Sequence, residues 1–260
     1  MKGFVKVIIA GAVILGIGII MLIALLAVNG WELNPDWEMK YYECEAENTE
    51  LEINYSAGEI STLFYDGDKI KIEYPECKNY DTTVYENGGK FSIVSGKRHW
   101  YNVALWTSKI PAATVYIPKD AVLKLDVTLN AGVLKIASGK YADIKFTMNA
   151  GAAQFGETVC GNLRIEMNAG ALNTGNIIAE TITAKVNAGA ADFKETICGK
   201  VGIELNAGSV NMQIDGISSE YSVSVEKNAG ACNLSSRQGT TDKRVDIEVN
   251  AGSCTVNFTN

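Results

Sequence analysis

Asn130-Ala131-Gly132 is the first of seven copies of one tripeptide in the second half of this 260-residue chain. The steps between successive copies are 19, 19, 19, 19, 22 and 22 residues. A fixed period of this size is typical of a solenoid, in which each repeat forms one coil and the coils stack on one another. The copies begin at Asn130, Asn149, Asn168, Asn187, Asn206, Asn228 and Asn250.

The residues that precede each tripeptide alternate between apolar and polar. Before the first copy, the apolar Leu125, Val127 and Leu129 enclose Asp126 and Thr128. An alternation of period two predicts a strand with one buried face. The corresponding apolar residues of five later coils are Ile144, Phe146 and Met148; Leu163, Ile165 and Met167; Ile182, Ala184 and Val186; Val201, Ile203 and Leu205; and Val245, Ile247 and Val249.

Apolar residues resume four and six positions after the Asn, so each tripeptide is predicted to be a corner between two strands. Glycine tolerates a positive φ angle, and Asn is the next most tolerant residue. Coils stacked at about 4.8 Å would also bring the Asn side chains into one column, where they can form an amide ladder. The resumed pairs are Leu134 and Ile136, Ala153 and Phe155, Ala191 and Phe193, Val210 and Met212, Cys232 and Leu234, and Cys254 and Val256. The corner glycines are Gly132, Gly151, Gly170, Gly189, Gly208, Gly230 and Gly252.

The Asn column is predicted to be structural. A ligand-binding row requires exposed side chains, whereas each Asn lies between two apolar runs. The repeat also differs from the calcium-binding nonapeptide of other solenoids, because its corner supplies no carboxylates. Lys227 takes an inward position immediately before Asn228 and predicts a local distortion of that coil.

The composition is that of a folded, acidic protein. Hydrophobic residues make up 47% of the chain and charged residues 20%, which is the balance of a globular protein. The net charge of −7 argues against nucleic acid as a partner, because phosphate binding requires a basic face.

The N-terminal segment is predicted to be a transmembrane anchor at residues 1–30, followed by a juxtamembrane linker at residues 31–43. Residues 7–28 carry no charge and are long enough for a spanning helix, which needs roughly 20 residues. A cleavable signal peptide is the alternative, although its apolar core is usually about 7 to 15 residues long. Lys2 and Lys6 precede the segment. The positive-inside tendency therefore predicts a single-pass signal anchor in the cell membrane, with the C-terminal part outside the cytoplasm.

Residues 44–120 are predicted to form degenerate coils, ahead of the regular solenoid at residues 121–260. Ser56-Ala57-Gly58 follows an alternating run and has Ser in place of Asn. It precedes Asn130 by 74 residues, which corresponds to about four coils. Candidate strands in this interval lie at residues 70–74, 90–94 and 114–117.

The segment from Gly96 to Pro111 fits no coil and is predicted to be an inserted loop. It contains His99, Trp100 and Trp106, whose rings could pack over the solenoid or form a contact surface. Cys44 and Cys77 also fall in the irregular part of the chain, where they could pair or stay reduced.

The other cysteines are predicted to be small core residues without disulfides. Cys160 and Cys198 share a coil position but lie two coils apart, roughly 9.6 Å, which exceeds the reach of a disulfide. Cys232 and Cys254 lie on adjacent coils with parallel Cβ vectors. No Cys-x-x-Cys motif or Cys/His cluster indicates a metal site.

Residues 117–127 read Ile117-Pro118-Lys119-Asp120-Ala121-Val122-Leu123-Lys124-Leu125-Asp126-Val127. An Ile-Pro-Lys turn, a Leu-rich strand and glycine corners, behind an N-terminal apolar segment, resemble the bacterial putative-adhesin family of β-strand-repeat proteins, a domain of unknown function. The resemblance covers residues 45–260 and implies a surface-associated β-solenoid without catalytic residues. That family commonly opens its second strand with a Gly-Asp pair, whereas this chain has pairs such as Gly-Ala or Gly-Ser.

The sequence shows no catalytic constellation, and we predict that the protein is not an enzyme and binds no cofactor or metal. His99 is the only histidine, and neither a phosphate-binding Gly-Lys-Ser/Thr loop nor a Gly-x-Ser-x-Gly elbow occurs. One outward column mixes charges with small polar residues instead of gathering carboxylates. It consists of Lys135, Gln154, Asn173, Asp192, Asn211, Asn233 and Thr255.

Three functional hypotheses follow from this architecture. The first is a membrane-anchored, surface-displayed adhesin or structural module that binds a polymer or protein of the cell envelope. The second is an envelope scaffold that polymerises through its coil ends. The third is a polysaccharide-modifying β-helix enzyme, which the mixed outward columns disfavour.

The strand near residues 253–258 is predicted to form the open end of the stack, with Cys254, Val256 and Phe258 inward. An uncovered terminal coil presents unpaired backbone groups and an apolar cross-section. We therefore expect weak self-association through this C-terminal coil.

The proposed register predicts a sharp contrast between inward and outward substitutions. Phe155→Ala or Phe193→Ala should lower the free energy of unfolding by about 3 to 5 kcal/mol, because each leaves a cavity between stacked coils. Outward Gln154→Ala or Asp192→Ala should change it by no more than about 0.5 kcal/mol. Equal effects of the two pairs in chemical denaturation would reject the register.

Overall fold

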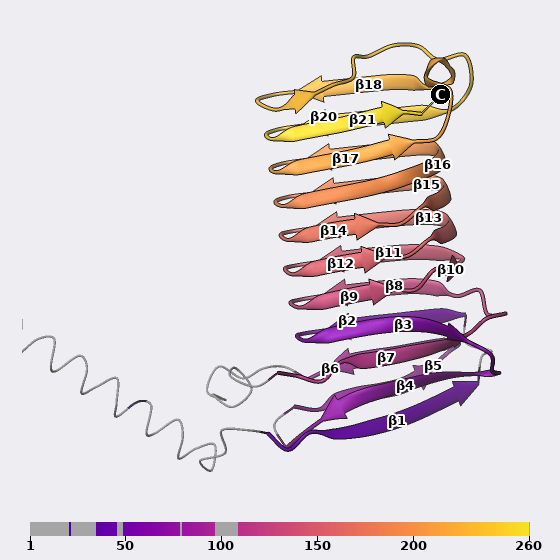
Figure 1. Cartoon of the computed structure of the whole chain (residues 1–260), viewed down its shortest axis with the longest axis vertical. Coiled ribbons are helices and arrows are strands. Elements are labelled where there is room, and N and C mark those ends of the chain that lie inside the picture. Colours follow the sequence, from indigo (N-terminus) through magenta and orange to yellow (C-terminus); the bar gives the residue numbers. More distant parts are fainter. Residues whose placement is uncertain (1–20, 22–34, 46–48, 79, 97–108, 260) are drawn as a thin grey trace, which may run out of the picture.

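The computed structural model describes residues 21, 35–45, 49–78, 80–96 and 109–259, most of which form one elongated stack of β-strands (Figure 1). Among the elements in these ranges, the 3-10 turn η1(Ser218–Glu220) is the only helical one. No helix of the described part is long and apolar enough to cross a bilayer. Apart from Met21, the predicted anchor lies outside the described residues, as do residues 97–108 of the predicted loop.

The strands that precede the corners form the first wall of the stack. Its strands are parallel to their neighbours, except that β5 at one end pairs antiparallel with β6. In spatial order the first wall contains β5(Thr82–Asn87), β6(Lys90–Ser95), β2(Glu50–Tyr55), β8(Lys124–Leu129), β11(Asp143–Met148), the later parts of β13(Thr158–Met167), β15(Ile177–Val186) and β16(Ala190–Leu205), then β20(Arg244–Val249) and β18(Ser222–Lys227).

The strands that follow the corners form the second wall. Neighbours are parallel from β7 to β19, whereas β1 and β4 add two antiparallel strands at the N-terminal end. In spatial order this wall contains β1(Glu38–Glu45), β4(Lys69–Glu76), β7(Ala113–Pro118), β3(Glu59–Tyr65), β9(Val133–Ile136), β12(Ala152–Phe155), β14(Ala171–Thr174), the first residues of β16, β17(Ser209–Ile214), β21(Ser253–Phe258) and β19(Ala231–Cys232).

The core is a column of side chains held in register between the walls. Ile144 lies opposite Leu125 on one side and Leu163 on the other, so equivalent residues of consecutive repeats contact each other. The two walls meet inside the coil, where the rings of Phe146 and Phe155 lie 5.3 Å apart. The predicted inward residues of the coils from Asn130 to Asn206, and those of the Asn250 coil from Val245 to Val256, are buried, whereas Cys232 and Leu234 of the Asn228 coil are half-buried. Together with the parallel register, this burial confirms the prediction of an all-β fold with stacked parallel strands.

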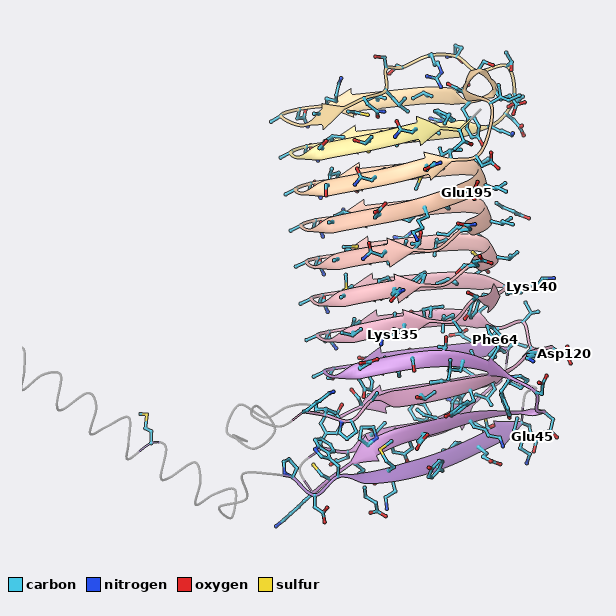
Figure 2. The ribbon with its side chains drawn as sticks, in the orientation of Figure 1. Glu45, Phe64, Asp120, Lys135, Lys140 and Glu195 are labelled. Atoms are coloured by element: carbon cyan, nitrogen blue, oxygen red, sulfur yellow. The ribbon has the colours of Figure 1, made fainter. Side chains whose placement is uncertain are left out.

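A third wall closes the middle coils, and the sequence analysis missed it. It contains β10(Gly139–Lys140) and the segments 158–160, 177–179 and 196–198. Lys140 and Glu195 lie on this side of the stack, opposite the corners (Figure 2). Each segment is only three residues of alternating burial, too short to stand out in the sequence as a strand.

The last two repeats do not stack in sequence order, which corrects our prediction. Strand β20 of the Asn250 coil pairs with β16 on one side and with β18 of the Asn228 coil on the other. The Asn250 coil is therefore inserted between the Asn206 and Asn228 coils. The inward position of Lys227 gives a physical reason for this order. Between two coils its charge would be buried, whereas at the end of the stack Lys227 is exposed.

The prediction that Cys254, Val256 and Phe258 form an open end is wrong for the same reason. Cys254 is buried between β17 and β19, Val256 is buried beside Met212 of β17, and the Phe258 ring packs 5.2 Å from that of Tyr221. The side-chain amide of Asn233 donates to the Val256 carbonyl and accepts from its N–H, both at 2.9 Å. The uncovered edge on which we based self-association through this coil is therefore absent from the described structure.

The true C-terminal end of the stack is covered by the chain segment that follows β19. The backbone N–H and carbonyl of Val223 on β18 are paired with those of Arg237 at 2.8 and 2.9 Å. The Ser236 hydroxyl accepts from the N–H of Val225 at 2.9 Å. These contacts occupy edge groups of β18 that would otherwise be open to pairing with another chain.

The N-terminal end also departs from sequence order. Tyr55 lies opposite Leu129, so the Ser56 coil stacks directly on the Asn130 coil. The predicted strands at 70–74, 90–94 and 114–117 fall within β4, β6 and β7. Strands β6 and β7 form a coil on the far side of the Ser56 coil, and β4 runs antiparallel to β7. The expectation of four successive coils in this interval is therefore wrong.

The cysteines form no disulfide among themselves in this structure. Cys160 and Cys198 are separated by Ala179 in the intervening coil, as predicted. Cys44 lies opposite Ile70 of β4. Cys77 is seven residues beyond Ile70 in the direction of β4, or about 23 Å away. The register therefore rules out a disulfide between Cys44 and Cys77. Burial raises the pKa of the Cys160 and Cys254 thiols to about 12, which keeps them protonated at neutral pH.

The insertion of the Asn250 coil predicts which strands depend on β20. Ile247→Lys places a charge at a buried site and should lower the free energy of unfolding by about 4 kcal/mol or more. Hydrogen exchange should accelerate in residues 201–205 as well as 222–227, because β20 pairs with both segments. The outward Glu248→Lys serves as the control and should leave both protected. Unchanged exchange at 201–205 in Ile247→Lys would contradict the insertion.

Candidate functional site

The seven corner Asn side chains form one continuous column. Each Nδ2 donates to the Oδ1 of the neighbouring coil: Asn149 to Asn130, Asn168 to Asn149 and Asn187 to Asn168 at 2.7 Å, and Asn206 to Asn187 and Asn250 to Asn206 at 2.8 Å, with Asn228 to Asn250 completing the column. Its order follows the stack, so Asn250 lies between Asn206 and Asn228. All six bonds run in the same direction, as in the amide ladders of stacked strands.

This column is on the outside of the molecule, and our premise that it is shielded is wrong. Asn149, Asn168 and Asn228 are exposed, and the other four are half-buried. The alternation of the strand explains this: the last inward residue, such as Leu129, is buried, so the following Asn points outward.

Both the backbone φ angle and the lack of space for a side chain require glycine at the corners. In Gly132, Gly151, Gly170, Gly189, Gly208 and Gly252 the φ angle lies between 103° and 124°. A Cβ at any of these six would lie only 2.0 to 2.2 Å from the carbonyl oxygen of the glycine in the neighbouring coil. Gly230, in the end coil, lacks the positive φ. The corner therefore has a structural role that accounts for its glycines.

The strongest candidate for a binding site lies elsewhere, on the outer surface of the second wall at its N-terminal end. Here β1, β4, β7 and β3 enclose a hollow of about 380 Å³, which we call the tyrosine pocket. Its lining is Tyr41, Tyr42, Glu43, Tyr65, Lys71, Ile72, Glu73 and Tyr116. A mainly apolar hollow with a few convergent polar groups is the usual form of a ligand site.

Strand register brings the charged groups of the tyrosine pocket together. Glu43 faces Lys71 across β1 and β4, and their charged atoms lie 3.2 Å apart. The phenol of Tyr41 donates to Glu73 Oε1 at 2.9 Å, and that of Tyr116 donates to Glu73 Oε2 at 3.5 Å. The bond to Glu73 raises the pKa of Tyr41, which therefore stays a neutral donor at physiological pH.

The rings of the tyrosine pocket present apolar surface at different angles. The Tyr65 and Tyr116 rings lie 6.0 Å apart and are inclined by 76°. Lys71 Nζ lies over the Tyr65 ring, 5.4 Å from its centroid. Tyr41 on the rim is 72% exposed, and Leu63 on β3 is 47% exposed. Contiguous exposed apolar surface that is rimmed by polar groups is a feature of interaction sites.

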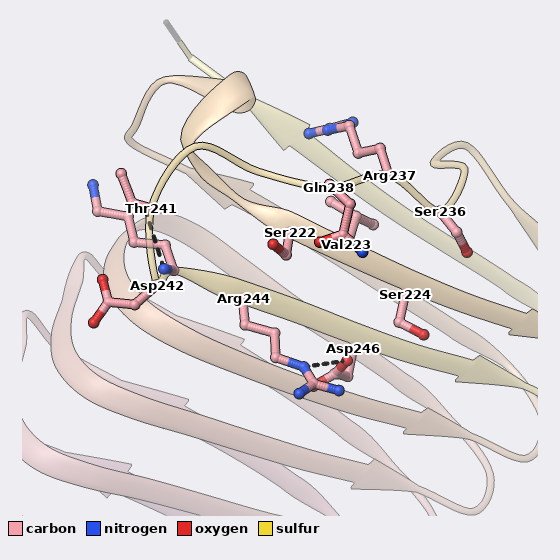
Figure 3. Close-up of a pocket in the computed structure, with 11 residues that line it drawn as sticks. Ser222, Val223, Ser224, Ser236, Arg237, Gln238, Thr241, Asp242, Arg244 and Asp246 are labelled. Atoms are coloured by element: carbon pink, nitrogen blue, oxygen red, sulfur yellow. Dashed lines mark hydrogen bonds and ion pairs between the residues drawn. The ribbon is translucent and has the colours of Figure 1, made fainter.

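A second hollow, of about 580 Å³, lies beside the covered C-terminal end (Figure 3). Its polar groups already hold the chain segment that covers the end of the stack. The Ser222 hydroxyl accepts from the N–H of Gly239 at 3.0 Å, and Arg237 donates to the Ser218 carbonyl at 2.8 Å. Arg244 pairs with Asp246 at its rim. We therefore assign this hollow a structural role.

The remaining sequence-predicted features gather no further site in the described chain. The outward column runs along the second wall, where Lys135 pairs with Glu59 (Figure 2). In the ranges that the structure describes, no group of three or more His, Cys, Asp or Glu side chains could hold a metal ion. His99 lies outside these ranges.

Sequence reasoning missed the tyrosine pocket because its residues come from four strands, β1, β3, β4 and β7, whose spatial order differs from their order in the chain. The antiparallel position of β4, between β1 and β7, could not be inferred from the repeat. One signal was present: Tyr116 takes an outward position between the buried Val115 and Ile117, where the regular coils carry polar residues.

Parallel coils with glycine corners define the class of this protein as an all-β, coil-stacking module. The chain belongs to the Toastrack DUF4097 family, whose model matches residues 48–260. This membership confirms the resemblance to a family of unknown function that the sequence indicated. No curated protein matches the chain.

Solved structures with some likeness to this chain include three bacterial proteins. A putative cell adhesion protein from Clostridium sporogenes is 14% identical over 87% of this chain and 100% of its own, with a TM-score of 0.41. A putative adhesin from Bacteroides fragilis is 10% identical over 86% and 99%, with a TM-score of 0.41. A putative adhesin from Parabacteroides distasonis is 8% identical over 85% and 97%, with a TM-score of 0.36.

The glycine column predicts a contrast between two identical substitutions. Gly170→Ala should lower the free energy of unfolding by about 3 kcal/mol or more, because its Cβ would meet the Gly151 carbonyl at a φ of 120°. Gly202→Ala, also in a regular coil, meets nothing within 4 Å and should change stability by no more than about 0.5 kcal/mol. Chemical denaturation of the full chain compares them, and equal midpoints would exclude a steric role for the corner.

Proposed function

We propose that this protein is an adhesin-type binding module of the cell envelope, which contacts a polymer or protein of the envelope through the tyrosine pocket. The single observation that carries the proposal is the pocket itself, an outward aromatic hollow with a carboxylate held by two phenols. Aromatic side chains supply large contact area at low entropic cost, and for that reason they dominate binding surfaces.

The shape of the stack favours binding of a ligand to its side over polymerisation of the protein through the ends of the stack. The C-terminal end is covered by Asn233, Ser236 and Arg237, which occupy backbone groups that an incoming strand would need. The tyrosine pocket, in contrast, lies on the outer surface of the second wall. An envelope scaffold that polymerises through its C-terminal coil is therefore the less favoured alternative.

We further propose that residues 1–30 anchor the module in the cell membrane as a single span, with the stack outside the cytoplasm. The uncharged run at residues 7–28 and the preceding Lys2 and Lys6 support this orientation. Glu38, where β1 begins, follows Val28 by ten residues, a distance of at most about 36 Å when fully extended. The tyrosine pocket would then lie close to the membrane, which suits a ligand in the cell's own envelope.

Intact bacterial cells that produce the full chain test this proposal. They should bind labelled, mechanically isolated cell-wall fragments, which contain both polymers and proteins, and should lose that binding when external protease removes the stack. Cells without the chain provide the background, and a known surface protein reports protease activity. Survival of the chain while the surface protein is digested would reject the orientation. Fragment binding that is unchanged after complete digestion would reject the function.

A further inference from the structure

We infer that the tyrosine pocket recognises a neutral sugar unit of an envelope polysaccharide. This inference rests on the proposed binding function and deepens it, because it names the chemical class of the ligand. Three kinds of observation on the pocket support it: the arrangement of its rings, the arrangement of its hydrogen-bonding groups, and its balance of charge.

The rings suit a ligand that has apolar faces and polar edges. Tyr65 and Tyr116 are half-buried and inclined by 76°, so they form two sides of the hollow, while Tyr41 offers a more exposed ring at the rim. A pyranose ring presents C–H groups on its faces and hydroxyls around its edge. Its faces can pack on the tyrosine rings while its edge stays in contact with polar groups, as amphipathic aromatic sites allow.

The polar groups suit hydroxyls in particular. Glu73 accepts one bond from Tyr41 and one from Tyr116, and a carboxylate has about four acceptor positions, so it can accept further bonds from a ligand. The Lys71 ammonium carries three N–H donors, of which one is directed at Glu43, so two remain for a ligand. Glu73 and Lys71 are neighbours on β4, at alternate positions of the same strand face. A sugar hydroxyl both donates and accepts, so adjacent hydroxyls can engage both groups together.

The charged groups of the pocket oppose an anionic ligand overall and a cationic ligand on the face of Tyr65. Glu43 and Glu73 outnumber Lys71, and the whole chain carries a net charge of −7, which opposes an anionic polymer. A quaternary ammonium ligand would seek an aromatic face, but Lys71 already lies 5.4 Å above Tyr65 and would repel it. A neutral ligand avoids both penalties.

The test measures binding of neutral oligosaccharides to the purified full chain by titration calorimetry. A polyoxyethylene detergent is used, because it carries neither sugar nor ammonium groups. The probes are hexamers of glucose in α-1,4 and β-1,4 linkage and of N-acetylglucosamine, with choline as the cationic probe and polygalacturonate as the anionic one. We expect at least one neutral hexamer to bind more tightly than choline or polygalacturonate.

Two variants place this binding at the tyrosine pocket. Tyr41→Ala should weaken binding by about tenfold, because it removes the most exposed ring. Glu73→Gln, which keeps the shape of the side chain, should weaken it by several-fold through loss of a charged acceptor. The matched control is Tyr85→Ala on β5, an exposed tyrosine outside the pocket, which should leave affinity within about twofold. Unchanged thermal unfolding confirms that the variants are folded.

Several results would overturn the inference. Equal effects of Tyr41→Ala and Tyr85→Ala would place the sugar elsewhere, and tighter binding of choline or polygalacturonate would reject the ligand class. If no hexamer binds while cells carrying the chain still capture cell-wall fragments, the neutral-sugar inference fails and the binding function stands. If no hexamer binds and the cells capture no fragments, both the neutral-sugar inference and the proposed binding function fail.

Discussion

The fold depends on direct contact between the backbones of successive corners. Every corner glycine except Gly230 lies against the carbonyl of the glycine in a neighbouring coil, at a distance that leaves no room for a side chain. This contact holds coils at the spacing of hydrogen-bonded strands, which in turn brings the Asn amides within bonding distance and places equivalent core residues against each other. The corner glycines thus control the geometry of all three walls, although they contribute no side chain themselves.

The sequence predicts the features of this fold that repeat. The 19-residue period and the alternation around Asn130 are enough to identify the corner, the inward residues and the parallel stacking, because each is local and recurs. Stack order could not be predicted, because the Asn228 and Asn250 repeats have the same local pattern. Only Lys227 distinguishes them, and we interpreted it as a distortion of the coil although it marks the end of the stack. The tyrosine pocket escaped prediction because it requires long-range antiparallel pairing of β4.

Regular and irregular parts of the described chain are separated along the length of the molecule. The middle coils are regular, with amides at the corners and mixed polar residues outside. Irregular, non-repeating chain is confined to the two ends, where it has different consequences. At the C-terminal end it satisfies open strand edges through Asn233 and Arg237. At the N-terminal end β1 and β4 extend the second wall and bring aromatic residues to its surface, so departure from the repeat accompanies the candidate binding site.

The inserted Asn250 coil also constrains how the chain folds. Coils from Asn149 to Asn206 can each stack on the preceding coil as soon as they are synthesised, because their contacts span only 19 residues. The Asn228 coil emerges before its neighbour and can transiently dock on the Asn206 coil, from which residues 244–258 must then displace it. Such a non-local step is slow relative to the local ones. In that premature arrangement Lys227 would point into the stack, and the cost of burying its charge disfavours the arrangement as a kinetic trap.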